Sequence, residues 1–412
     1  MHCTKAFAIC TVAVTVITAA SAARADVPLV SFTPGDLVLM RGGDATNSQT
    51  TLSGGEVAAY LDEYTTAGVY VGTLAIPASQ LTLPGATANS HEGRLNLSGD
   101  GKYLDFAGYQ QAVGATPRVT NNSGTGSYYN VGQVAGNGTM VSSSLNTAVS
   151  APQFVRGAYS NDGNEVWVAS KSPTGGLEYI SGFGSGSPTT VALQSTTDWR
   201  DVKVAAGQLY GGTGSSSVGT HGFYAIGTGQ PTSGTPANTL LTNASDNSVS
   251  GFSFMTLAGG NPISGVAGSA NTVYTVGDPS GNNYIGKLFS NGAPLTTSDL
   301  SFAGGSRLAL SAGNYGGSTP EGVLAQIDPT NSTWVDLFIV AKDGVYFSID
   351  KSGTSTGGIG SLSFSKIISN TADTNFYGIA SAPSVPEPSS LLLLGTGAML
   401  GIFAVWRRRR RA

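Results

Sequence analysis

The sequence has very little charge and almost no cysteine. Charged residues make up 11% of the 412 residues, against roughly 25% in an average globular chain. Both cysteines, Cys3 and Cys10, precede the signal-peptide cleavage point that we predict below, so the mature chain contains no disulfide and no thiolate. Its stability must therefore come from hydrogen-bonded strands and apolar packing rather than from cross-links.

Histidine and basic residues are also scarce. Only His91 and His221 follow the predicted cleavage point, 130 positions apart, which leaves little material for a multi-histidine metal site. Seven of the 20 basic residues lie in the two chain ends, so residues 26–385 carry 13 Lys and Arg against 23 Asp and Glu, a formal charge of −10. An acidic chain without basic clusters lacks the electrostatic footprint of nucleic-acid binding. We expect no metal, no cofactor and no nucleic acid.

The first 25 residues have the features of a signal peptide. Lys5 precedes an apolar run from Ala6 to Ala20, and Ala23 and Ala25 occupy the −3 and −1 positions that signal peptidase recognises. The predicted mature chain begins at Asp26. A permanent membrane anchor is the alternative, but the apolar run is short and ends in a cleavage pattern.

Residues 385–412 form a tail of three parts. The middle part, residues 389–406, is apolar, and 18 helical residues would rise about 27 Å, close to the roughly 30 Å of bilayer hydrocarbon. We therefore predict a transmembrane helix. Positive residues beside a span stay in the cytoplasm, which places residues 26–384 outside. The flanking parts are the motif Val385, Pro386, Glu387 and Pro388 and the cluster Arg407, Arg408, Arg409, Arg410 and Arg411.

The order of these parts resembles the PEP-CTERM sorting signal of Gram-negative bacteria, which an integral-membrane exosortase processes. The resemblance implies that Pro386, Glu387 and Pro388 are the recognised motif and that the helix holds the protein transiently in the inner membrane. It also implies a mature protein that is released or held at the cell surface. The expected partners during export are signal peptidase and exosortase. A simple tail anchor with a chance Pro-Glu-Pro is the alternative.

The body has the pattern of an all-β domain. Short β-branched or aromatic runs alternate with Gly, Asn, Asp and Ser turns, and hairpin units with a Ser-x-Asp-Gly turn occur at residues 94–107 and 156–169. A blade of about 50 residues predicts a β-propeller of about seven blades, within a range of six to eight; a β-helix or an irregular double sandwich is the alternative. The aromatic anchors treated as equivalent are spaced by 64, 43, 64 and 72 residues: Tyr103, Trp167, Tyr210, Tyr274 and Tyr346.

Five segments of the body support this fold: residues 35–38, 61–68, 92–104, 207–210 and 377–383. They resemble a family of secreted, propeller-like bacterial proteins of unknown activity that often carry the same tail. The resemblance supports the fold and assigns no activity. If the ring closes by pairing its two ends, Asn375 to Ser381 would join the blade that begins with Asp36 to Met40, which would make residues 26–384 one domain.

Two short charged segments contain the candidate ligand contacts. His91 and Glu92 open the first hairpin unit; Glu92 could be a general acid, although a polar residue that leads into a strand is the more ordinary interpretation. In the second segment Trp199 could stack on a sugar ring, between Asp198 and Asp201. In an extended strand Asp198 and Asp201 point to opposite faces, so salt pairing at the strand entry competes with ligand binding.

Two functions from different classes fit these observations. The first is a non-catalytic scaffold of the cell envelope or extracellular matrix that binds polysaccharide or another surface protein. The second is an extracellular glycan-active propeller enzyme, a lyase or a hydrolase. The shortage of histidine and the lack of a convergent acid pair favour the scaffold, and no catalytic residue is assigned. Two carboxylates, or His with Arg or Tyr, converging at one mouth of the central channel would reverse this preference.

Overall fold

The computed structural model describes residues 26–43, 55–85, 91–115, 129–144, 154–171, 176–184, 188–194, 198–214, 221–242, 248–263, 270–277, 283–290, 300–302, 307–371 and 374–385. All regular structure in these ranges is β-strand, which confirms the predicted all-β class. The predicted signal peptide, transmembrane helix and arginine cluster lie outside the described residues. Within those ranges, no helix has the length and apolar character needed to cross a membrane.

The two ends of the body and the segments after its first strand make one large sheet. Its strands are β1 (Leu37–Gly42), β2 (Glu56–Tyr64), β3 (Tyr70–Ala75), β4 (Thr82–Pro84), β5 (Asn96–Leu97), β6 (Tyr103–Tyr109), β7 (Tyr129–Ala135), β8 (Met140–Ser144) and β26 (Asn375–Ser381). They are ordered β26-β1-β2-β4-β6-β7-β8, with β3 paired to β2 and β5 paired to β6. All pairings in this sheet are antiparallel.

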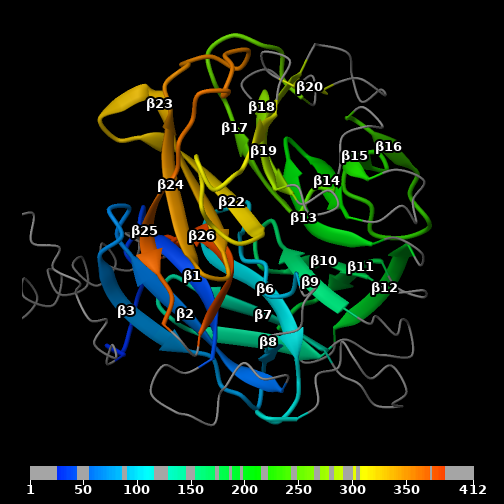
Figure 1. Ribbon diagram of the computed structural model, residues 1–412. Coiled ribbons are helices and arrows are strands. Elements are labelled where there is room, and N and C mark those ends of the chain that lie inside the picture. Colours follow the sequence, from blue (N-terminus) through cyan, green and yellow to red (C-terminus); the bar gives the residue numbers. More distant parts are fainter. Residues whose placement is uncertain are drawn as a thin grey trace, which may run out of the picture.

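The rest of the described body forms smaller antiparallel sheets that follow one another around the molecule, from green to orange in Figure 1. The first two contain β9 (Phe154–Tyr159), β10 (Glu165–Lys171), β11 (Leu177–Ser181) and β12 (Thr189–Gln194), then β13 (Trp199–Ala205), β14 (Gln208–Thr213), β15 (Gly222–Ile226) and β16 (Asn238–Leu240). The last two contain β17 (Gly251–Met255), β18 (Thr272–Gly277), β19 (Tyr284–Ser290), β20 (Leu300–Phe302) and β21 (Leu308–Ala309), then β22 (Pro320–Asp328), β23 (Asn331–Ala341), β24 (Gly344–Asp350) and β25 (Ser365–Ser369). The arrangement is propeller-like.

A closed ring of strands lies at the centre of this arrangement. In order, β5 contacts β9, β9 contacts β13, β13 contacts β17, β17 contacts β22, β22 contacts β26, and β26 contacts β5. We call these six the inner strands. Each inner strand comes from a different sheet or, for β5 and β26, from a different part of the large sheet. The sheets therefore radiate from a common centre.

The ring closes where the two ends of the body pair. Strand β26 lies antiparallel to β1, from Leu37 opposite Ser381 to Gly42 opposite Asn375. This confirms the predicted pairing of the chain ends. The hydroxyl of Tyr377 also donates a hydrogen bond of 2.7 Å to the carbonyl oxygen of Pro84, which ties β26 to β4.

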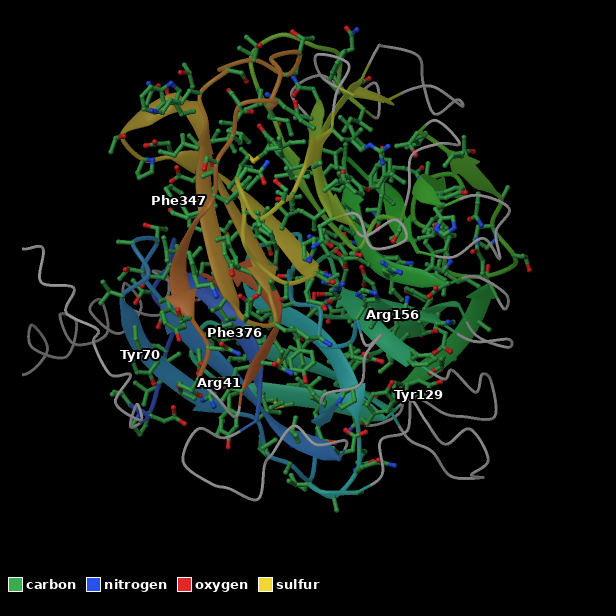
Figure 2. The ribbon with its side chains drawn as sticks, viewed as in Figure 1. Arg41, Tyr70, Tyr129, Arg156, Phe347 and Phe376 are labelled. Atoms are coloured by element: carbon green, nitrogen blue, oxygen red, sulfur yellow. The ribbon has the colours of Figure 1, made fainter. Side chains whose placement is uncertain are left out.

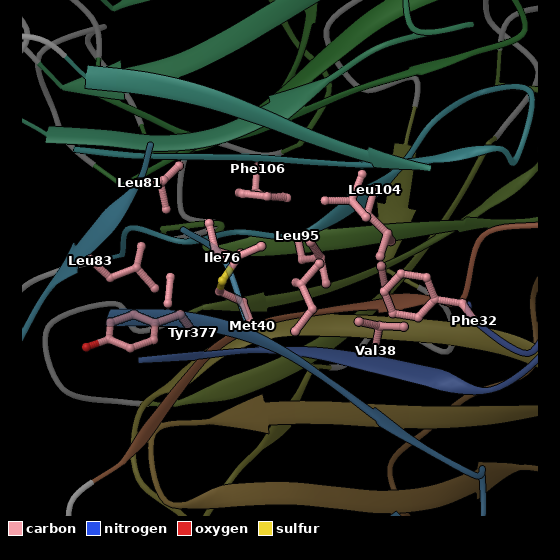
Figure 3. Close-up of a cluster of buried hydrophobic side chains, with 14 of the residues drawn as sticks. Phe32, Val38, Met40, Ile76, Leu81, Leu83, Leu95, Leu104, Phe106 and Tyr377 are labelled. Atoms are coloured by element: carbon pink, nitrogen blue, oxygen red, sulfur yellow. The ribbon is translucent and has the colours of Figure 1, made fainter. Parts of the chain in front are cut away.

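Apolar side chains fill the spaces between neighbouring sheets. In the cluster of Figure 3, Val38 and Met40 of β1 lie opposite Leu104 and Phe106 of β6, and all four are fully buried. Burying one such side chain stabilises the fold by about 1.5–3 kcal/mol. Similar clusters join β6 and β7 to β9 and β10, and β14 and β15 to β17 and β18.

Four of the five aromatic anchors of the hairpin units lie on the strand that follows an inner strand. Trp167, Tyr210 and Tyr274 are each the third residue of that strand, in β10, β14 and β18, whereas Tyr103 is the first residue of β6. Tyr346 lies instead on β24, the third strand of its sheet, so its predicted equivalence is wrong. The Asp343-Gly344 turn that precedes it connects the second and third strands rather than the first and second.

Candidate functional site

Each inner strand brings one polar residue to the same end of the ring. This residue lies near the beginning of the strand or just before it. They are Arg94, just before β5; Arg156 in β9; Arg200 in β13; Ser250, just before β17; Glu321 in β22; and Asn375 in β26.

Hydrogen bonds connect several of these positions across the ring. The Arg94 amide donates to the Arg156 carbonyl oxygen at 3.0 Å, and Arg94 Nη2 donates to Glu321 Oε2 at 3.1 Å. Arg200 Nη1 donates to Ser250 Oγ at 2.6 Å. The beginnings of these inner strands therefore lie side by side, and Arg156 is near the middle of the view in Figure 2.

Loop residues beside the strand beginnings complete a buried polar group. His91 and Glu92 precede Arg94, and Asp198 precedes Arg200; all three side chains are buried. We call the whole set the central cluster: His91, Glu92, Arg94, Arg156, Asp198, Arg200 and Glu321.

Glycines allow residues 91–95 to lie against β26. Gly93 has a φ of +69°, which L side chains rarely adopt, and a Cβ on Gly378 would lie 2.5 Å from the Gly93 carbonyl oxygen. A side chain at either position would push the loop away from the inner strand. The two glycines thus position His91, Glu92 and Arg94 at the centre.

His91, Arg94 and Glu321 form a close triad. His91 Nδ1 lies 3.0 Å from Glu321 Oε2, and Arg94 Nη2 lies 3.1 Å from each of these atoms. Burial lowers the pKa of His91 to about 3, and the nearby charge of Arg200 adds to this effect, so the imidazole is neutral. Burial alone would raise the pKa of Glu321, but its contacts with His91 and Arg94 outweigh burial and lower that pKa to about 2.

Glu92 has the opposite character. It is fully buried, and neither carboxylate oxygen accepts a hydrogen bond from another described residue. Burial raises its pKa to about 7, although the charge of Arg156 opposes the rise. Glu92 therefore changes protonation near neutral pH, whereas Glu321 stays ionised.

The arginines are only partly neutralised by carboxylates. Arg94 is paired with Glu321, and Arg156 Nη1 donates to the Asp198 carboxylate. Arg200 has no carboxylate within ion-pair distance in the described part of the chain; besides Ser250, it reaches only the Gly214 carbonyl oxygen, at 3.5 Å. Burial and then the repulsion of Arg156 lower the pKa of Arg200 to about 10, so it remains positive at neutral pH.

Several guanidinium N–H groups in the central cluster have no hydrogen-bond partner among the described residues. They are Arg94 Nε and Nη1, Arg156 Nε and Arg200 Nε. A buried polar group left unpaired costs about 1–3 kcal/mol, and more when it is charged. When Glu92 is protonated, three arginines therefore face two ionised carboxylates, and the cluster holds one excess positive charge as well as unused hydrogen-bond donors.

The candidate residues predicted from the sequence lie in different surroundings in the structure. His91, Glu92 and Asp198 belong to the central cluster. Asp201 lies one layer deeper, where it accepts a hydrogen bond of 2.9 Å from Asn96 and lies 3.6 Å from Lys203 Nζ.

Trp199 does not offer a face for stacking on a sugar. Its ring is fully buried in an apolar cluster, edge-on to Tyr224, and Nε1 donates to Gln194 Oε1 at 2.9 Å. Trp199 is therefore a core residue, and the prediction that it stacks on a sugar ring is wrong.

A break in the strand pattern explains how Asp198 and Asp201 come to lie near the same neighbour. The register between β13 and β14 shifts between Trp199 and Asp201, which is the mark of a β-bulge at Arg200. Asp198 pairs with Arg156, and Asp201 Oδ1 would lie 3.0 Å from a Cβ on Gly157, the next residue of β9. The salt pairing at the strand entry is present, while the alternation of faces is interrupted.

Three residues of the site were not predicted from the sequence as ligand contacts: Arg94, Arg156 and Glu321. Arg94 and Arg156 are the first residues of the two matched hairpin units, so their equivalence was visible in the sequence. Arg200 lies within the charged segment 198–201 that was predicted as a candidate, whereas the segment of Glu321 has no comparable signal.

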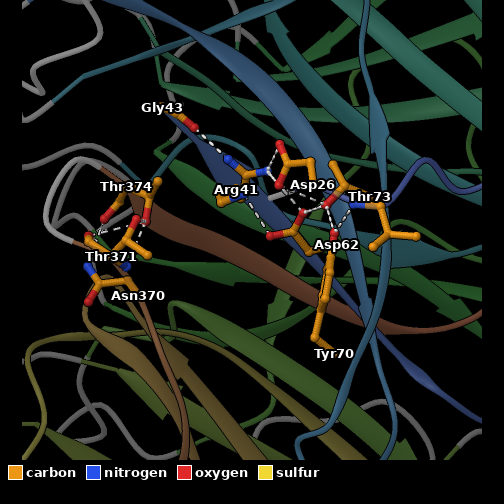
Figure 4. Close-up of polar contacts among 10 residues, drawn as sticks. Asp26, Arg41, Gly43, Asp62, Tyr70, Thr73, Asn370, Thr371 and Thr374 are labelled. Atoms are coloured by element: carbon orange, nitrogen blue, oxygen red, sulfur yellow. Dashed lines mark hydrogen bonds and ion pairs between the residues drawn. The ribbon is translucent and has the colours of Figure 1, made fainter. Parts of the chain in front are cut away.

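A second polar group lies in the first sheet, away from the central cluster. Arg41 Nε donates to Asp62 Oδ2 at 2.7 Å, Arg41 Nη2 lies 3.2 Å from Asp26 Oδ2, and Thr73 Oγ1 donates to Asp62 Oδ1 at 2.6 Å (Figure 4). Asp26, Arg41 and Asp62, together with Thr371 and other residues, line a small pocket. In the described ranges, no three His, Cys, Asp or Glu side chains are grouped to hold a metal ion.

Residues 384–410 match the PEP-CTERM protein-sorting motif. This confirms the predicted sorting signal and indicates export, processing by exosortase and sorting to the cell surface. No curated protein matches the chain.

Three solved structures are distantly similar to the chain. A gluconolactonase from Xanthomonas campestris has 12% identity and a TM-score of 0.38, with 83% of this chain and 88% of that chain covered. The haemagglutinin-neuraminidase ectodomain of parainfluenza virus 5 has 9% identity and a TM-score of 0.38, with 85% and 84% covered. Prolyl oligopeptidase B from Galerina marginata has 10% identity and a TM-score of 0.34, with 77% and 40% covered. These likenesses give no basis for assigning an activity.

Proposed function

We propose that the mature protein is a non-catalytic binding scaffold of the cell envelope or extracellular matrix, and that the central cluster is its ligand-binding region. The observation that carries this proposal is the set of unpaired N–H groups on Arg94, Arg156 and Arg200. Buried donors of this kind are costly without a partner, and a bound ligand would supply one. Polysaccharide and other surface proteins are the partners within reach of an exported protein.

The proposed scaffold has six blades. Each inner strand begins one blade, and the large sheet divides at β4 into a blade with β26, β1, β2 and β3 and a blade with β5, β6, β7 and β8. This number lies at the lower end of the predicted range. The first blade then contains both ends of the body, and the pairing of these ends closes the ring.

Export proceeds in this proposal by the steps that the chain ends predict. Signal peptidase cuts after Ala25, residues 389–406 span the inner membrane, and Arg407 to Arg411 stay in the cytoplasm until exosortase acts near Pro388. Mass spectrometry of the native protein tests these steps. An N-terminus at Asp26 and loss of the arginine tail support them, whereas an intact tail would indicate a simple tail anchor.

A glycan-active enzyme is the second candidate, because the convergence that would favour it is partly present. His91, Arg94, Glu92 and Glu321 lie together, and Glu92 has a pKa suited to proton transfer near neutral pH. Glu92 is 0% exposed and Arg94 is 2% exposed, which limits access for a substrate and for a bound ligand alike, so burial does not separate the two candidates. Only one of these groups titrates near neutrality. The scaffold therefore remains the first candidate.

Glycan-array binding by residues 26–385 separates the two candidates, with an Arg156→Met variant and an Arg307→Met control outside the cluster. The scaffold predicts binding that Arg156→Met weakens and that leaves the glycan intact. Release of new reducing ends or unsaturated products from a bound glycan, lost in Glu92→Gln, would establish the enzyme instead. Equal binding by the wild type and Arg156→Met would remove the central cluster from the proposal.

A further inference from the structure

The chemistry of the central cluster also indicates which ligand it can hold. Its arginines come from three successive inner-strand positions, and two of them are already neutralised by Glu321 and Asp198. Arg200 is not paired with a described carboxylate. When Glu92 is protonated, the centre of an acidic protein thus carries an uncompensated guanidinium, which favours an anionic ligand.

The unpaired donors indicate the kind of anion. Each arginine of the cluster has a buried Nε without a partner among the described residues, and Arg94 has an unpaired Nη1 as well. Hydrogen bonds from a guanidinium to a charged oxygen are stronger than those to a neutral hydroxyl. The donor set therefore favours an oxyanion such as a carboxylate over a neutral sugar.

Arg200 is the most exposed arginine of the cluster. Arg94 and Arg156 are 2% and 3% exposed, whereas Arg200 is only half-buried. Arg200 lies against Gly214, where a Cβ would come within 1.7 Å of Arg200 Nε. The absence of a side chain at position 214 leaves the guanidinium room to lie as it does, beside Ser250.

We propose that Arg200, together with Arg94 and Arg156, binds the carboxylate group of an acidic sugar. This proposal rests on the proposed function, because the location outside the inner membrane makes uronate-containing glycans the available ligands. The carboxylate takes the unpaired N–H groups and neutralises the charge of Arg200. Ser250 stays bonded to Arg200 and holds it in place.

The test is calorimetric binding of glucuronate, glucose and phosphate to the full-length protein in mild detergent. We expect glucuronate to bind and glucose, its neutral counterpart, to bind at least about tenfold more weakly. Arg200→Met and Gly214→Ala should each weaken glucuronate binding by about tenfold or more, because one removes the guanidinium and the other displaces it. Arg307→Met should leave binding unchanged.

Three outcomes overturn the proposal: equal binding of glucose and glucuronate, phosphate binding as tight as glucuronate binding, or full glucuronate binding by both Arg200→Met and Gly214→Ala. Gly214→Ala retains every charge, so it remains informative if Arg200→Met does not fold. If neutral glycans bind on the array and Arg200→Met does not weaken that binding, only the acidic-sugar assignment is refuted. Absence of any glycan or protein ligand would refute the proposed function itself.

Discussion

Replacing Glu92 by glutamine should change how the stability of the protein depends on pH. The pKa of Glu92 is 4.5 in an unfolded chain and about 7 in the folded protein, mainly because of burial. The folded state therefore binds more protons than the unfolded state between these values. The contribution of the Glu92 carboxyl to the free energy of unfolding is fully present below pH 4.5 and is lost as the pH rises through 7. At about 1.4 kcal/mol per pKa unit, the loss is about 3 kcal/mol.

Urea unfolding of the wild type and Glu92→Gln at several pH values measures this effect. The difference in unfolding free energy should shift by about 3 kcal/mol in favour of Glu92→Gln between pH 4.5 and pH 8. Other buried carboxylates contribute equally to both proteins and cancel. Glu178→Gln is a positive control. Burial raises the pKa of Glu178 to about 8, so its contribution to the free energy of unfolding changes over a wider pH range than that of Glu92. A Glu92→Gln difference that stays constant across this range would refute the assigned environment of Glu92.

Two further substitutions test the first sheet and the closure of the ring. Arg41→Met leaves Asp62 buried without its guanidinium partner, so urea unfolding should show a loss of about 3–5 kcal/mol; a loss below about 1 kcal/mol would contradict the buried pair. Tyr377→Phe removes the hydrogen bond to the Pro84 carbonyl, and the same measurement should show a loss of about 1 kcal/mol. An unchanged stability would mean that this hydrogen bond does not contribute to closure.

The strands could be predicted because they depend on local patterns, and the ring closure could be predicted from the fold that those strands indicate. Gly101 and Gly163 have φ values of +73° and +88°, as the Asp-Gly turns require, and each turn follows an inner strand. The pairing of residues 375–381 with the first strand also follows from the need to close a ring. The equivalence of Tyr346 failed because an Asp-Gly turn can join any two neighbouring strands, so it does not identify which pair it joins.

The central cluster could be predicted only in part. Arg94 and Glu321 are 227 residues apart, and only the ring of inner strands brings them together. Strand alternation also failed at Arg200, because a β-bulge redirects the side chains there. Trp199 looked available for stacking because sequence alone does not distinguish an exposed aromatic at a strand entry from a core residue.

Scarcity of charge makes the buried charges of this protein easier to interpret. Charged side chains are rarely buried unless they are paired, and most of those described here follow this rule. Lys287 is fully buried, yet Nζ donates to Asp350 Oδ2 at 2.7 Å, to Ser352 Oγ at 2.8 Å and to the Thr354 carbonyl oxygen at 2.7 Å. That group is complete and needs no ligand.

The central cluster differs from this complete group in one decisive respect. Among the described residues, the arginine N–H groups that are buried without partners all belong to Arg94, Arg156 and Arg200. Both groups contain buried cations near carboxylates, so burial and ion pairing do not distinguish a structural role from binding. The two groups differ in their unused arginine donors, which a purely structural network would gain stability by satisfying. These arginine donors are the basis of the proposed ligand site at the centre of the ring.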